Sequence, residues 1–169
     1  MSKKRMSVLG AALLVIGLVG AGIVPSVAQE PPPPPIATEF LSGRAEFTDD
    51  VTLLIKIKRD GTRTEVVKVD DPSRTVVARF TVQPGAQFPW HSHAGPVVVN
   101  VVEGTLTYLM NDCGERDYPA GTAFVDPGHG HVHSAINAGD VPVVFVATFF
   151  EAPAEGPLLI PADAPPCAA

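Results

Sequence analysis

The strongest constraint on the fold of this chain is a series of short β-branched and aromatic runs, separated by turn sequences, from about residue 38 to residue 151. Clusters of Gly, Pro, Asp and Asn lie between the runs, and no stretch after residue 30 has a helical period. Many short strands at regular spacing are typical of an all-β sandwich or barrel. We therefore expect one all-β domain over residues 38–152, with strands at residues 53–58, 65–69, 75–82, 97–102, 105–110, 122–125 and 141–150.

The N-terminus has the order of residues found in a secretory signal peptide. Three basic residues precede an apolar stretch at residues 8–24, and small residues follow it up to Ala28. We predict a Sec-type signal peptide over residues 1–28, cleaved after Ala28, and a protein that is secreted or held in the cell envelope or periplasm. The alternative is an uncleaved membrane anchor, because the apolar stretch is long enough to span a bilayer.

The segments on either side of the expected domain are rich in proline. Residues 31–35 are five consecutive prolines, which predict a stiff linker over residues 29–37. Residues 153–169 are rich in Pro and Ala, and we expect them to form an irregular tail.

The net charge and the two cysteines indicate which binding partners and which cellular compartment to expect. Loss of residues 1–28 would leave nine basic and eighteen acidic groups, a net charge of −9. This charge repels nucleic acid and anionic membranes, so we expect a small-molecule ligand and no stable membrane insertion after cleavage. Both cysteines, Cys113 and Cys167, belong to the exported part, where disulfides form. We predict a bridge between them; two free thiols are the alternative.

The histidines carry the clearest functional signal. They form two clusters with alternate spacing, and imidazole is the commonest side-chain ligand of transition metals. In an extended strand, residues i and i+2 share a face, so each cluster could present several rings to one point. In the second cluster we expect His129 at the surface, and His131 is either a ligand or a loop residue. The clusters are His91 and His93, and His129, His131 and His133.

The spacing around these histidines resembles the two sequence motifs of the cupin superfamily. The first motif is matched by Gly85, five residues, His91-Ser92-His93, three residues, Val97, six residues and Gly104. The second is matched by Gly121, five residues, Pro127, then His133, three residues and Asn137, with one extra residue between Pro127 and His133. The resemblance covers residues 75–150 and implies a single, type-2-like cupin domain, a jelly-roll-like double-stranded β-helix barrel.

The resemblance also implies a metal centre. His91, His93 and His133 occupy the positions of family ligands, with His131 as an additional candidate, while Val97 replaces the family's fourth ligand, a Glu. Iron is the first choice of divalent metal, and Mn, Ni, Cu and Zn also suit imidazole ligands. Homodimers are common in the family, so a homodimer is a further expectation.

The replacement of the Glu by Val97 affects the expected chemistry. Three neutral imidazoles leave the charge of the ion uncompensated and leave coordination positions open, which favours an anionic or bidentate substrate. We therefore expect an O₂-dependent dioxygenase acting on a small anionic or chelating organic molecule. The alternatives are a non-catalytic cupin of the cell envelope that binds a metal or small molecule, and a metal-free module with an apolar ligand.

Residues near the expected ligands supply the other site candidates. Val97, Val99, Trp90 and Phe124 are expected to line a substrate pocket. Asp126 either orients an imidazole or forms the turn before Pro127.

Overall fold

The computed structural model describes residues 32–59 and 63–168, with the Cys167 side chain excepted. The predicted signal peptide lies outside these residues. Within them the chain is all-β, as predicted, and its one helical element is a short 3-10 turn, η1 (Pro166–Ala168). No helix in the described ranges is long and apolar enough to cross a membrane.

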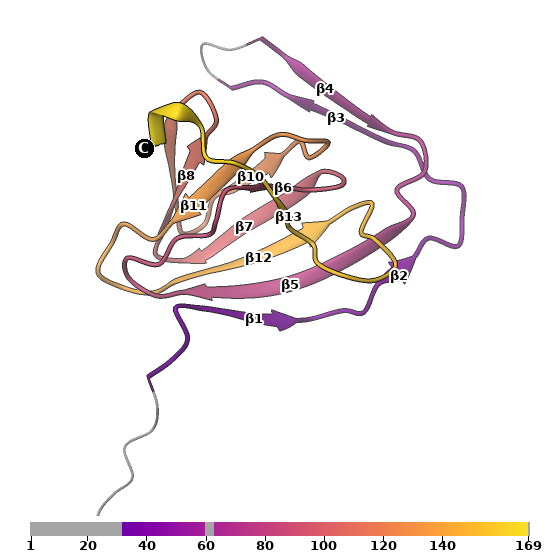
Figure 1. Ribbon diagram of the computed structural model, residues 1–169. Helices are drawn as coiled ribbons and strands as arrows, with labels where there is room; N and C mark the ends of the chain where they lie inside the picture. Colours follow the sequence, from indigo (N-terminus) through magenta and orange to yellow (C-terminus); the bar gives the residue numbers. More distant parts are fainter. Residues whose placement is uncertain (1–31, 60–62, 169) are drawn as a thin grey trace, which may run out of the picture. The chain divides into compact units, whose positions relative to one another are not determined.

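The strands form two larger antiparallel sheets and a separate hairpin (Figure 1). The first sheet has the order β1-β5-β12-β7-β10, with β2 also paired to β5; its strands are β1 (Ile36–Phe40), β2 (Ala45–Glu46), β5 (Arg74–Val82), β7 (Val97–Glu103), β10 (Ala123–Asp126) and β12 (Val143–Phe149). The second sheet has the order β13-β6-β11-β8-β9, from β6 (His91–Ser92), β8 (Thr105–Met110), β9 (Glu115–Pro119), β11 (His133–Ile136) and β13 (Ile160–Pro161). The hairpin pairs β3 (Leu53–Ile57) with β4 (Glu65–Val69).

The core lies between the two larger sheets. Alternate residues of β12 are buried over its whole length, which is the pattern of a strand with one face toward a core. Phe80 and Phe145 stack at 4.9 Å between ring centroids, and Leu106 and Tyr108 reach the same core from the second sheet. The two sheets therefore pack face to face as in a jelly roll, but their hydrogen bonding does not close into one continuous barrel.

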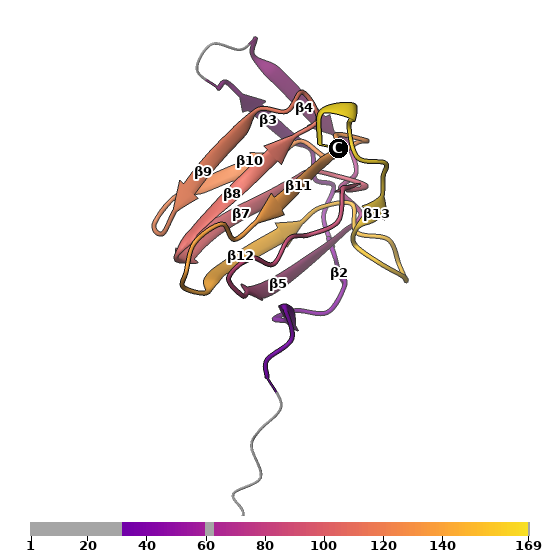
Figure 2. The same ribbon diagram turned by 60° about the vertical axis from the view of Figure 1, so that its left-hand side comes forward.

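The C-terminal segment differs from the expected irregular tail. Residues 153–162, here called the C-terminal strap, run along the edge of the second sheet and include β13, which pairs with β6 (Figure 2). The guanidinium of Arg44 donates hydrogen bonds to the carbonyls of Pro153 and Gly156. These contacts order a proline-rich segment because its carbonyls accept hydrogen bonds even where its own ring nitrogens cannot donate them.

The predicted bridge between Cys113 and Cys167 involves a side chain outside the described part of the structure. Cys113 lies in the turn between β8 and β9, where its amide donates to the Met110 carbonyl at 2.9 Å. Cys113 and Ala168, the neighbour of Cys167, line the same surface groove. The disulfide stays a prediction.

Candidate metal centre

Two short strands of the second sheet bring the two histidine clusters together. β11 pairs with β6 so that His133 lies directly opposite His91. His93 follows β6 by one residue, and its ring centroid lies 4.8 Å from that of His91 and 5.2 Å from that of His133. All three side chains are buried. Residues 40 positions apart in the sequence thus form one cluster because the strand register places them side by side.

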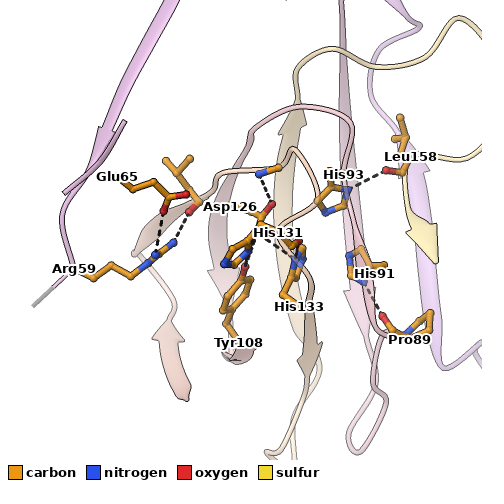
Figure 3. Close-up of polar contacts among 12 residues, drawn as sticks. Arg59, Glu65, Pro89, His91, His93, Tyr108, Asp126, His131, His133 and Leu158 are labelled. Carbon is orange, nitrogen blue, oxygen red and sulfur yellow. Dashed lines mark hydrogen bonds and ion pairs between the residues drawn. The ribbon is translucent and has the colours of Figure 1, made fainter. Parts of the chain in front are cut away.

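The hydrogen bonds of the three rings decide which nitrogen faces the centre of the cluster. Nδ1 of His91 donates to the Pro89 carbonyl at 2.7 Å, and Nδ1 of His93 donates to the Leu158 carbonyl at 2.9 Å (Figure 3). Nδ1 of His133 donates to the His131 carbonyl at 3.4 Å and also lies 3.1 Å from Oδ2 of Asp126. Because carbonyl and carboxylate oxygens only accept, each Nδ1 carries the proton, and each Nε2 keeps its lone pair.

Asp126 connects the cluster to a wider buried network. Its Oδ2 accepts hydrogen bonds from the Tyr108 hydroxyl and from Nδ1 of His131, at 3.0 Å for the latter, in addition to its contact with His133. Its Oδ1 accepts from the Gly128 amide at 2.8 Å. Asp126 therefore does both things considered from the sequence, since one oxygen holds the imidazole and the other forms the turn.

Burial and hydrogen bonding determine the charges of these groups. Burial lowers the pKa of His91 to about 4 and, despite the nearby Asp126, that of His133 to about 3; it also lowers the pKa of His93. For Asp126, burial opposes ionisation, but the hydrogen bond from His131, the adjacent His133 and the hydrogen bond from Tyr108 outweigh it and hold the pKa well below its usual range. At neutral pH the site therefore combines neutral imidazoles with an ionised carboxylate.

The donor set fits a transition metal. One ligand nitrogen from each of His91, His93 and His133 lies within 4.8 Å of the others. Nitrogens bound to one ion at about 2.1 Å lie at most about 4.2 Å apart, so small ring rotations bring all three to bonding distance. A ligand imidazole normally donates its other N–H to an oxygen acceptor, and all three rings already do so.

A cavity of about 50 Å³ adjoins the cluster and is mainly apolar. Val97, Val99 and Phe124 line it, as do Tyr108 and Leu159. The hydrogen bond from Tyr108 to Asp126 has no local signal in the sequence. Leu159 had none either, because it lies in the C-terminal strap.

Three of the remaining sequence candidates lie away from the cavity. Trp90 lines the surface groove next to Cys113, because it alternates with His91 and so faces the other side of the strand. His131 is not one of the three clustered rings, but with Asp126 and His133 it forms a second group whose ligand atoms lie within 4.8 Å of one another. His129 is half exposed, and its Nε2 pairs with Glu151 at 2.5 Å; the sequence predicted this surface position.

Comparison with known proteins adds the family. Residues 78–149 match the model of the cupin domain family. This part of the chain belongs to the cupin superfamily. The match begins within β5 and ends with β12, so it contains the metal-ligand candidates of the cupin domain but excludes the C-terminal strap. A comparison with curated protein sequences finds no match.

Solved structures with similarity to this cupin include three bacterial proteins. A protein with a double-stranded β-helix domain from Klebsiella pneumoniae subsp. pneumoniae is 24% identical, over 53% of this chain and 70% of that one, with a TM-score of 0.41. The polyketide cyclase RemF from Streptomyces resistomycificus is 22% identical, over 54% and 64%, with a TM-score of 0.44. The cupin domain of a transcriptional regulator from Enterobacter cloacae is 16% identical, over 68% and 95%, with a TM-score of 0.46.

Proposed function

We propose that this cupin binds one divalent transition metal through His91, His93 and His133, and that with iron it carries out the O₂-dependent oxidation of a small anionic or chelating organic substrate. The observation that carries the proposal is the pattern of hydrogen bonds on the three buried rings. Each Nδ1 is bound to an oxygen acceptor, and each Nε2 is left for a ligand.

The protein residues divide the work at such a centre. The three imidazoles would hold the ion, and the Pro89 carbonyl, the Leu158 carbonyl and Asp126 would keep the rings in the required tautomer and orientation. Bound iron would supply the redox chemistry for O₂ and the Lewis acidity that attracts the substrate. The apolar wall, which includes Val97 and Phe124, would exclude water from the reacting groups.

The charges favour a monoanionic ligand. A divalent ion with three neutral imidazoles carries two positive charges, and the ionised Asp126 beside His133 compensates one of them. A singly charged carboxylate, thiolate or enolate would complete the compensation within a low-dielectric site. Val97 leaves vacant the position where a carboxylate of the chain would otherwise compete with that ligand.

The size of the cavity favours a second candidate. A volume of about 50 Å³ holds roughly three to five water molecules, so a drug-sized substrate does not fit with the C-terminal strap in place. A non-catalytic cupin that binds a metal and a small ligand in the cell envelope would need no more space.

Metal analysis and oxygen uptake separate these proposals. The mature chain is reconstituted with Fe(II), Mn(II), Ni(II) or Zn(II), desalted and analysed for metal. We expect about one equivalent in the wild type, a loss of at least 10-fold in His133→Ala and no loss in His129→Ala, the matched surface control. Less than about 0.1 equivalent of every metal in the wild type would contradict both metal proposals.

Catalysis is tested on the iron-loaded protein. We expect O₂ consumption with at least one member of a panel of small thiols, β-diketones and catechols, abolished in His133→Ala. Full iron loading without O₂ consumption would favour the non-catalytic function.

We also propose that the protein is exported. The apolar N-terminal segment and the two cysteines of the remaining chain support this location. N-terminal sequencing of the protein from the culture medium and cell envelope tests it, with residue 29 as the expected first residue. An intact N-terminus in the membrane fraction would favour the uncleaved anchor.

A further inference from the structure

The C-terminal strap touches the metal-centre candidates directly. β13 pairs with β6 so that Pro161 lies opposite His91, and the Ala162 amide donates to the Trp90 carbonyl at 3.0 Å. Figure 1 shows β13 of the strap beside β6, and β13 is the edge strand of the second sheet. The strap therefore covers the strand that carries the first histidine cluster.

Two adjacent leucines of the strap contribute to the site in different ways. The carbonyl of Leu158 accepts the Nδ1 proton of His93 at 2.9 Å (Figure 3). Leu159, in turn, forms part of the cavity wall. The Leu158 side chain packs against the core without lining the cavity. Both residues lie outside the region matched by the cupin family model.

Few interactions fix the C-terminal strap to the rest of the domain. They include a two-residue strand, the two hydrogen bonds from Arg44, the bond from His93 to the Leu158 carbonyl, the bond from Ala162 and the partial burial of Leu158 and Leu159. Residues 154–157 are exposed. Segments with few buried contacts open at a lower free energy than the core strands do.

We propose that the C-terminal strap is part of the metal centre: Leu159 limits the size of the ligand that reaches it, and the Leu158 carbonyl positions His93. The inference rests on the proposed function for its ligand, since the site would admit anions of a few heavy atoms with the strap in place. Larger chelating anions bind only when the strap moves or when its wall is trimmed.

The first test needs no metal. Diethyl pyrocarbonate acylates neutral imidazole nitrogens, and mass spectrometry of peptides measures the rate at each histidine. In metal-free protein we expect Leu159→Ala, which removes three carbons from the wall, to raise the rate at His93 by at least 10-fold. Leu54→Ala, the matched control with the same chemical change at an exposed position of β3 away from the cavity, should change it by less than 3-fold. Equal rates in the wild type and both variants would overturn the inference even if no metal ever binds.

The second test uses the Co(II)-loaded chain and two anions of different size, azide and benzohydroxamate, followed by visible absorption. We expect Leu159→Ala to tighten benzohydroxamate binding by at least 10-fold and to change azide binding by less than 3-fold. A change by the same factor for both anions would refute the control of size. A failure to load Co(II) would contradict the proposed function and leave the acylation result to decide on the strap.

The positioning role of Leu158 has its own readout. Two-bond ¹H–¹⁵N NMR spectra of the metal-free protein report the tautomer of each ring. We expect His93 to be protonated at Nδ1 in the wild type and to lose this preference in a chain that ends at residue 157. His91, which is held by Pro89, serves as the internal control. The full-length Arg44→Ala variant loosens the strap without shortening the chain and should shift His93 in the same direction. An unchanged His93 tautomer in both variants would overturn the positioning role.

Discussion

Replacement of Asp126 by Asn tests the network behind the metal centre. The carboxylate is almost fully buried, and it accepts from the Gly128 amide on one oxygen and from Tyr108 and His131 on the other, which also lies 3.1 Å from Nδ1 of His133. Asn has one accepting oxygen and one NH₂ group that only donates. In either orientation at least one of the three donors faces the NH₂ group, and the negative charge beside His133 is lost.

The expected losses of stability and of metal affinity follow from these contacts. A hydrogen bond to a charged group contributes about 1.5–3 kcal/mol, so one lost bond and the weakening of the others should lower the free energy of unfolding by about 3 kcal/mol. For the metal, loss of the acceptor that fixes a ligand imidazole typically costs 10–100-fold in affinity, which is about 1.4–2.7 kcal/mol. We therefore expect Asp126→Asn to weaken Co(II) binding by at least 10-fold at pH 7.5.

The assay has a matched control within the chain. Asp117 also accepts a side-chain hydrogen bond, from Thr107 at 2.6 Å, but it lies on β9 and does not line the cavity. Co(II) affinity is measured by visible absorption, and urea unfolding of the metal-free variants gives their stability. The reasoning would be refuted if a folded Asp126→Asn protein bound Co(II) within 3-fold of the wild type, or if Asp117→Asn weakened binding equally.

Three further predictions concern pH, position 97 and the cysteines. In the metal-free folded protein the pKa of His91 is about 4, whereas the pKa of this residue in the unfolded chain is near 6.5. Between these two pH values the unfolded chain therefore binds more protons than the folded protein. The contribution of His91 to the free energy of unfolding is fully present above pH 6.5 and is lost as the pH falls toward 4. From pH 7 to pH 5 this contributes a loss of about 2 kcal/mol in urea unfolding, which His91→Ala should remove. Val97→Glu should destabilise the metal-free protein relative to Val97→Gln, because Val97 lies opposite the ionised Asp126. With metal bound, Val97→Glu should also weaken azide binding by at least 10-fold. Equal stabilities of the two metal-free variants would contradict the predicted repulsion between the carboxylates. Mass spectrometry of the exported protein should show Cys113 and Cys167 in one disulfide-linked peptide, which reduction separates with a gain of about 2 Da; two alkylatable thiols before reduction would rule the bridge out.

Much of the sheet structure could be predicted because it depends on local alternation. The runs at residues 65–69 and 105–110 become β4 and β8 with the predicted bounds. β9 could not be predicted from composition, because Glu115–Pro119 is largely charged and mostly exposed and has the character of an edge strand. β13 has only two residues, one of which is a proline, and it is a strand only because it pairs with β6.

The candidate site also has a part that the sequence predicts and a part that depends on tertiary contacts. Side-chain type and spacing pointed to His91, His93 and His133, and the pairing of β6 with β11 brings them together. The groups that orient two of these rings are the main-chain carbonyls of Pro89 and Leu158, and every residue type has a carbonyl. Their position depends on tertiary contacts that leave no pattern in the sequence.

The position of Asp126 changes the meaning of the missing carboxylate ligand. Asp126 on β10 is the register partner of Val97 on β7, so a carboxylate lies directly across the strand pair from the residue that replaced the family Glu. It contacts Nδ1 of His133 and is not a member of the group formed by the three histidines. A negative charge near the proposed ion would thus be retained while a coordination position is released. Because a carboxylate behind an imidazole also strengthens that imidazole as a donor, the loss of one ligand is partly offset by better binding through another. The Val at position 97 is therefore more consistent with a centre opened for an external ligand than with one that has lost its metal.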